Sequence, residues 1–66
     1  MEIKRLRVQA KLTQMQVAEA THVDRSTVAH WESGMSMPRS ELLPMLADLF
    51  GCTIDALFGR EAKDTA

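Results

Sequence analysis

The sequence predicts an all-α domain made of five short helices. Three observations support this fold class: apolar residues recur three or four positions apart, helix-capping residues precede several of these stretches, and nothing alternates with the period of a strand. The chain has 66 residues, of which 45% are hydrophobic, so it is near the lower size limit for one core. We therefore predict one domain over residues 1–59 and a charged, frayed tail over residues 60–66.

The first two helices are predicted from the amino-terminal third of the chain. A stripe of apolar residues indicates a first amphipathic helix, and its members are Ile3, Leu6 and Ala10. Thr13 stands three residues before Gln16, the spacing at which a cap hydroxyl and a returning Gln side chain bond each other's backbone amides. The second helix is therefore expected to begin at Gln14.

The segment DRSTVAHWESG, from Asp24 to Gly34, predicts a third helix with two different faces. Asp24 is a typical cap and Gly34 a typical helix end, and Val28 and Trp31 share the inward face. The outward face consists of Ser26, Ala29, His30 and Ser33, with Arg25 at the amino end. Small side chains flanked by hydrogen-bond donors suit a helix that enters the major groove of DNA, although many surface helices look similar.

The carboxyl-terminal third carries two further helices. The fourth is expected to begin at a Ser40 cap, to tolerate Pro44 in its first turn, and to bury Leu43, Leu46, Ala47 and Phe50. Gly51 ends it. The fifth begins after a Thr53 cap, buries Ile54 and Leu57, and ends at Gly59.

Composition excludes several classes of protein. A single cysteine cannot form an internal disulfide, and no apolar run is long enough to span a bilayer, so we expect a cytoplasmic protein. His22, His30 and Cys52 lack the spacing of metal ligands, and no phosphate-binding loop or paired catalytic carboxylates occur. We therefore expect no metal, no cofactor and no enzymatic activity.

The net charge is −1 and the pI is about 6.0, which is not typical of a nucleic-acid-binding protein. The charges are unevenly distributed, however. Residues 1–31 contain five basic and three acidic residues, a balance of +2. Residues 32–66 contain three basic and six acidic residues, a balance of −3. One half could face phosphates, but a mixed solvated surface explains the charges equally well.

The spacing of six residues is that of a helix-turn-helix, and they are Gln14, Ala18, His22, Val23, Val28 and Trp31. The chain resembles the Cro and phage-repressor type of helix-turn-helix regulators, also called the xenobiotic-response-element family, from Ile3 to Gly59. The matching segments are LRVQAKLTQMQVA, VDRSTVAHWESG, LLPMLADLF and TIDALFG. The resemblance implies a lambda-repressor-like fold and a DNA-binding transcription regulator of bacterial or phage origin. His22 replaces the glycine usual in the turn, where φ is positive, at a cost of about 1 kcal/mol.

The resemblance also implies roles for individual residues. The positions that contact bases correspond to Arg25, Ser26, Ala29 and His30, and those that contact the DNA backbone to Gln14, Thr27, Arg39, Lys4, Arg5 and Lys11. The family residue that matches Gln14 also often buttresses the base-contacting helix, and a simple first-turn residue is the alternative for Gln14. Solvated side chains are the alternative for Ser26 and His30. Arg7 is expected to form a structural ion pair with Glu32, with a phosphate contact as the other possibility.

A dimer that reads an inverted-repeat operator follows from the same resemblance, because two-fold pairing places two helices in successive major grooves. The candidate dimer contacts are Met35, Met37, Leu57 and Phe58. The implied function is that of a repressor or autoregulator that excludes polymerase. The alternative is a protein-interaction module of the antitoxin or anti-repressor type, in which DNA binding is secondary.

Overall fold

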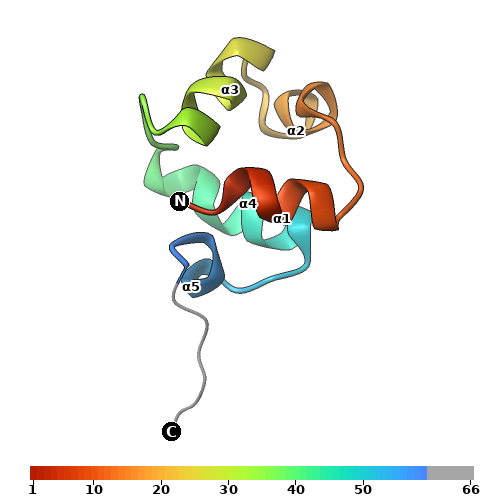
Figure 1. Ribbon diagram of the computed structural model, residues 1–66, viewed down its shortest axis with the longest axis vertical. Coiled ribbons are helices and arrows are strands. Elements are labelled where there is room, and N and C mark those ends of the chain that lie inside the picture. Colours follow the sequence, from red (N-terminus) through yellow and green to blue (C-terminus); the bar gives the residue numbers. More distant parts are fainter. Residues whose placement is uncertain (60–66) are drawn as a thin grey trace, which may run out of the picture.

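The computed structural model describes residues 1–59, and all of its regular structure is helical (Figure 1). The helices are α1 (Ile3–Gln9), α2 (Gln14–Thr21), α3 (Arg25–Ser33), the 3-10 turn η1 (Ser40–Leu42), α4 (Leu43–Phe50) and α5 (Ile54–Leu57). The all-α prediction is therefore confirmed for these residues. The tail predicted over residues 60–66 lies outside the described part of the chain.

Figure 1 shows how the helices are arranged. α2 and α3 lie together at one end of the molecule, α1 and α4 lie side by side in the middle, and α5 lies at the opposite end. A hydrogen bond from the backbone N–H of Glu2 to the carbonyl of Leu57, at 2.8 Å, joins the start of α1 to α5. The helix pair that resembles a helix-turn-helix is thus supported by a platform formed by the other helices.

One core holds these helices together, and α1, α2, α3, η1, α4 and α5 all contribute to it. Its buried members are Ile3, Leu6, Val17, Ala18, Val28, Trp31, Leu42, Leu46, Ala47 and Leu57. Trp31 is 4% exposed, so the only tryptophan anchors α3 to the core, as the sequence predicts. Cys52 is partly buried against the same cluster.

The ends of the helices follow the sequence signals in most cases. Thr13 and Gln16 form the predicted capping box: the Thr13 hydroxyl accepts from the Gln16 N–H at 3.0 Å, and the Gln16 side-chain oxygen accepts from the Thr13 N–H at 2.8 Å. The Thr53 hydroxyl caps α5 by accepting from the Ala56 N–H at 3.1 Å. Asp24 occupies the cap position of α3, but within the described residues its side chain makes no capping hydrogen bond.

The turn between α2 and α3 adopts the backbone conformation expected of it. His22 has φ 61° and ψ 43°, in the left-handed region, which confirms the predicted positive φ. The following N–H, that of Val23, donates to the carbonyl of Ala18 at 3.0 Å, so the turn closes directly onto α2. Lys11, in the turn between α1 and α2, also has φ 61°, which the sequence did not indicate.

Two predictions for the carboxyl-terminal third are wrong in detail. Ser40 is not a cap but the first residue of η1, preceded by an extended Arg39. Leu43 and Phe50 are partly buried against the core, as predicted, and Leu42 in η1 is buried in it as well. Ile54 is 40% exposed, since α5 is a single turn that directs its next apolar residues, Ala56 and Leu57, into the core.

Candidate nucleic-acid interface

α3 presents one face to the core and another to solvent. Val28 and Trp31 are buried, whereas Arg25, Ser26 and His30 are exposed and Ala29 is half-buried. Residues separated by three or four positions lie on the same face of a helix, so the predicted base-contacting residues form one continuous surface along α3. The geometry therefore leaves this surface accessible to a ligand.

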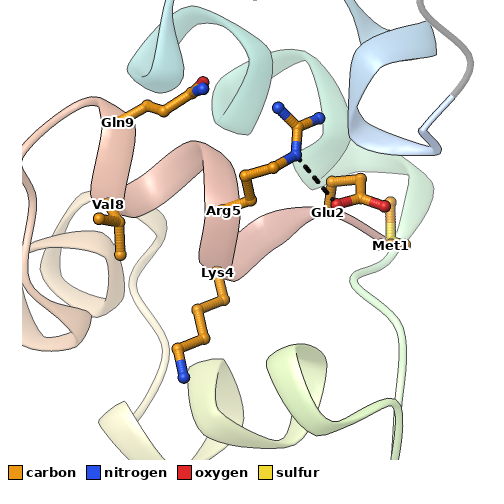
Figure 2. Close-up of a pocket in the computed structure, with 6 residues that line it drawn as sticks. All are labelled: Met1, Glu2, Lys4, Arg5, Val8 and Gln9. Atoms are coloured by element: carbon orange, nitrogen blue, oxygen red, sulfur yellow. Dashed lines mark hydrogen bonds and ion pairs between the residues drawn. The ribbon is translucent and has the colours of Figure 1, made fainter.

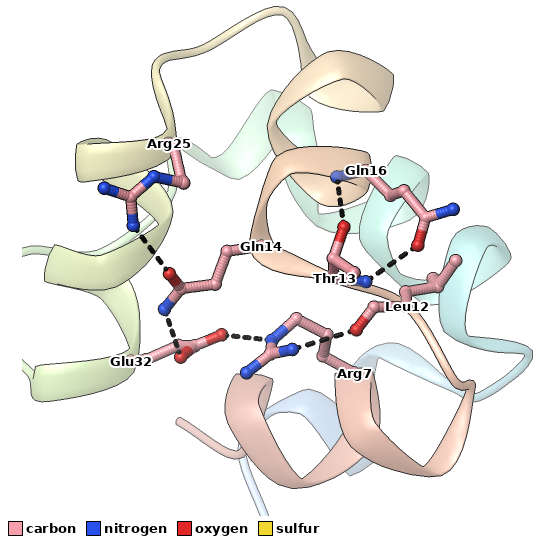
Figure 3. Close-up of polar contacts among 7 residues, drawn as sticks. All are labelled: Arg7, Leu12, Thr13, Gln14, Gln16, Arg25 and Glu32. Atoms are coloured by element: carbon pink, nitrogen blue, oxygen red, sulfur yellow. Dashed lines mark hydrogen bonds and ion pairs between the residues drawn. The ribbon is translucent and has the colours of Figure 1, made fainter.

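Four polar side chains connect α1, α2 and this surface of α3 (Figure 3). Arg7 Nε donates to Glu32 Oε2 at 2.6 Å, Gln14 Nε2 donates to Glu32 Oε1 at 2.9 Å, and Arg25 Nη1 donates to Gln14 Oε1 at 3.1 Å. We call Arg7, Glu32, Gln14 and Arg25 the polar relay. Its last member, Arg25, is one of the predicted base-contacting residues.

The inner half of the polar relay is largely excluded from water. The side chain of Arg7 is 14% exposed and that of Glu32 is 7% exposed, and Arg7 Nη1 also donates to the backbone carbonyl of Leu12 at 2.9 Å. Charge-assisted hydrogen bonds in such an environment are stronger than those in water. The ion pair between Arg7 and Glu32 that the resemblance implies is thus present, and it joins α1 to α3.

The resemblance implies the ion pair and a supporting contact from Gln14 to the base-contacting helix, but not the individual hydrogen bonds of the polar relay. The hydrogen bonds from Gln14 to Glu32 and from Arg25 to Gln14 link residues 18 and 11 positions apart in the chain. Spacing within one helix cannot indicate such contacts, because they depend on how α2 crosses α3. The available signal was chemical: an amide at the start of α2 offers both a donor and an acceptor.

Comparison with known proteins places this arrangement in a family. The family model described as helix-turn-helix matches residues 3–57. The chain belongs to the helix-turn-helix family. In this family's terms, α2, the turn at His22 and α3 form the helix-turn-helix, and the other helices support it.

Two curated relatives of this helix-turn-helix chain are bacterial proteins. It is 38% identical over 60 residues to the HTH-type transcriptional activator BcrR of Enterococcus faecalis, a match that covers 91% of this chain and 29% of the relative. It is 50% identical over 50 residues to the HTH-type transcriptional regulator AnsR of Bacillus subtilis (strain 168), covering 74% of this chain and 43% of the relative. The chain thus matches less than half the length of each relative. No solved structure matches it significantly.

The cations predicted to contact phosphates are distributed over several elements of the helix-turn-helix domain. Lys4 and Arg5 lie on α1, Lys11 follows α1, and Arg39 precedes η1, and all four are exposed. Arg5 Nε donates to Glu2 Oε1 at 3.1 Å, and Arg39 is 3.8 Å from Glu41 in an exposed pair. These four side chains are therefore not gathered on the surface of α3.

Lys4 and Arg5 also border a shallow groove on the outer side of α1 (Figure 2). The groove has a volume of about 500 Å³ and is lined by Met1, Glu2, Lys4, Arg5, Val8 and Gln9. Figure 2 shows the side chains of Lys4 and Arg5 extending in different directions from the helix. The predicted phosphate contacts of these two residues thus depend on how DNA approaches α1.

The predicted dimer contacts divide into exposed and buried residues. Met35 and Met37, in the loop after α3, are exposed, and Phe58, which follows α5, is 41% exposed. Leu57 is completely buried in the core, so the prediction that it contacts a second copy is wrong. Its place in the single-turn α5 directs it inward, toward Leu46 and the rest of the core cluster.

No helix within residues 1–59 has both the length and the apolar character needed to cross a membrane. Among the same residues, no three His, Cys, Asp or Glu side chains lie close enough to hold a metal ion.

Proposed function

We propose that the chain binds double-stranded DNA sequence-specifically through α3 and thereby regulates transcription. The observation that carries this proposal is the exposed surface of α3, on which Arg25 is held by Gln14 at 3.1 Å. A guanidinium has five N–H donors, so one hydrogen bond can fix it while a pair of donors remains for guanine O6 and N7. An arginine held in this way loses less conformational entropy on binding than a free one.

The other side chains of α3 have complementary roles in this proposal. Ser26 donates to or accepts from a base edge, His30 contacts a base edge or a phosphate, and Ala29 packs against bases. The residues proposed to contact the DNA backbone are Gln14, Thr27, Arg39, Lys4, Arg5 and Lys11. They fix the register of the protein on the duplex, because phosphate contacts position a protein while base contacts specify the sequence.

The functional unit that we propose is a homodimer on an inverted repeat. Two copies of α3 related by a two-fold axis enter successive major grooves about 34 Å apart. The proposed dimer contacts are Met35, Met37 and Phe58, which are exposed apolar side chains. A single α3 offers few base contacts, so pairing would provide the affinity that one domain lacks.

We propose repression as the mode of regulation, because a dimer bound across a promoter excludes RNA polymerase without any further partner. One relative is named an activator, so activation is the competing outcome. A reporter with the binding site placed either over the promoter or upstream of it separates the two. Repression from the overlapping site supports the proposal, and activation from the upstream site alone contradicts it.

The DNA interface can be located by titrating the ¹⁵N-labelled chain with duplex DNA and following amide chemical shifts. The proposal predicts that the largest changes occur at Gln14 and along residues 25–30. Changes confined to the α1 groove or to α5, or no changes at all, would contradict it. Titrating the same labelled chain with proteins captured from a bacterial lysate tests the alternative, that the chain is a protein-interaction module.

A further inference from the structure

Glu32 determines how the Gln14 amide is oriented in the polar relay. An ionised carboxylate can only accept hydrogen bonds, and Glu32 accepts from Arg7 on Oε2 and from Gln14 on Oε1. Gln14 must therefore turn its Nε2 toward Glu32. The amide oxygen of Gln14 then faces the opposite side, where only a donor can satisfy it, and Arg25 supplies that donor at 3.1 Å.

The ion pair with Arg7 does not require this arrangement. Arg7 uses Nε for Glu32 Oε2 and Nη1 for the carbonyl of Leu12, so it is held without any contribution from Gln14. The second oxygen of Glu32 is thus available for Gln14, on the side facing the amino end of α3 (Figure 3). One carboxylate therefore joins a structural contact to a residue of the DNA-binding surface.

We propose that Glu32 is a positioning residue for base recognition. It orients the Gln14 amide so that an acceptor faces position 25, and it thereby holds Arg25 for guanine without touching DNA itself. This inference rests on the proposed function. It makes Glu32, whose side chain is 7% exposed, an indirect determinant of sequence specificity.

Glu32→Gln tests the proposal with almost no change in size. The new amide has one oxygen and one NH₂ group, and the cationic Arg7, which is largely buried, takes the oxygen. The NH₂ group then faces Gln14, which turns its own oxygen toward it. Gln14 consequently presents NH₂ to Arg25, and two donors cannot bond each other.

Exchanging the amide at position 14 with the carboxylate at position 32 avoids placing two donors opposite each other. In Gln14→Glu combined with Glu32→Gln, the amide at position 32 donates to the carboxylate at position 14, which has a second oxygen to accept from Arg25. Arg7 still has the oxygen at position 32, and the net charge of the protein is unchanged. The double variant therefore restores an acceptor opposite Arg25.

The experiment compares the Kd for a selected duplex with the Kd for a duplex changed at the base pair that Arg25→Ala no longer discriminates. One bidentate arginine–guanine contact corresponds to a ratio of about 5 to 150. The Kd ratio of the wild type is expected to lie in this range, and that of Glu32→Gln is expected to be below about 3. The exchanged double variant is expected to recover most of the wild-type ratio. A carboxylate at position 14 is repelled by the phosphates of both duplexes to the same extent, so this effect cancels in the ratio of the two Kd values.

Val17→Ala is the control for lost stability, because it removes buried methyl groups from α2 without touching the polar relay. It is expected to keep the wild-type ratio. A second readout needs no DNA: the guanidinium N–H resonances of Arg25 should be protected from exchange in the wild type and the double variant, and should lose protection in Glu32→Gln.

The outcomes separate this inference from the proposed function. A wild type without any base preference would overturn the proposed function. A wild-type preference that survives Glu32→Gln, or that the exchanged double variant does not recover, would overturn the role of Glu32 alone. Equal loss of the ratio in Val17→Ala would show that stability, and not the orientation of Gln14, controls recognition.

Discussion

Arg7 and Glu32 form a largely buried contact beside the proposed DNA-binding surface. The two side chains come from α1 and α3, are 2.6 Å apart at their closest atoms, and are largely buried. Removing one partner leaves the other charge without compensation in a region of low dielectric constant. The same carboxylate orients Gln14, so stability and recognition meet at one residue.

Arg7→Ala is expected to lower the free energy of unfolding by about 3 kcal/mol, because it leaves Glu32 buried without its cation. Urea denaturation followed by the fluorescence of Trp31 measures this change. Arg39→Ala is the matched control, since Arg39 is 73% exposed in its pair with Glu41, and its expected cost is below about 0.5 kcal/mol. Equal costs for the two variants would contradict the structural role of Arg7.

Arg25→Ala is expected to weaken binding to a selected operator by about 1–3 kcal/mol and to remove discrimination at one base pair per half-site. The reason is the loss of a bidentate contact to guanine. Competition binding with operators changed at single positions measures both effects.

Arg39→Ala again provides the comparison for this binding experiment. A phosphate contact has no base preference, so its loss should weaken binding to all sequences about equally. If Arg25→Ala behaves in the same way as Arg39→Ala, the assignment of Arg25 to base recognition is wrong.

At the scale of helices, the sequence predicts what depends on local chemistry. The capping box at Thr13 and the cap at Thr53 are both present, because each arises from residues within one turn. The positive φ at His22 is also present, but it was predicted from the resemblance to the family. The burial of Val28 and Trp31 also follows from the period of a single helix.

What could not be predicted depends on how helices meet. The burial of Leu57 agrees with the sequence prediction, but the exposure of Ile54 does not. It reflects a one-turn α5 placed against the core, which no periodicity in four residues can indicate. The hydrogen bonds of Gln14 require the crossing of α2 and α3. The candidate site was thus predictable as a set of exposed residues on α3, but its internal connections were not.

The turn between α2 and α3 offers a test at this scale. His22→Gly is expected to raise the free energy of unfolding by about 1 kcal/mol, because His22 has φ 61° and a side chain in the left-handed region is strained. In a domain of this size the melting temperature should rise by about 4–8 °C.

The control for the turn is the other histidine. His30→Gly places glycine inside α3, where it should cost about 0.5 kcal/mol relative to histidine. Calorimetry measures the melting temperatures of both variants. Destabilisation by His22→Gly would mean that the imidazole makes a contribution larger than its backbone strain.

At the scale of the whole molecule, the helix-turn-helix and α5 lie at opposite ends (Figure 1). In the proposed dimer, this separation leaves the surface of α3 free for DNA while Phe58, next to α5, contacts a second copy. The charge does not follow this division: the positive balance through Trp31 comes from residues 1–13, and residues 14–33 contain one basic and three acidic residues. Few cations are available, so base contacts and pairing must supply much of the affinity.

Phe58→Glu is expected to weaken dimerisation at least tenfold, because it places a charge in an apolar contact. Analytical ultracentrifugation across a concentration series measures the monomer–dimer equilibrium. Val8→Glu is the control: Val8 is 57% exposed on α1 and Phe58 is 41% exposed, and Val8 lies outside the proposed contact. A dimer weakened by Val8→Glu and not by Phe58→Glu would place the interface on α1.

Selection of bound duplexes from a random DNA pool, performed in parallel with the wild type and Arg25→Ala, tests the central claim most directly. The wild type is expected to enrich an inverted repeat with half-sites about one helical turn apart, containing a guanine that Arg25→Ala no longer selects. Enrichment of no sequence, or of the same sequence by both proteins, would contradict it.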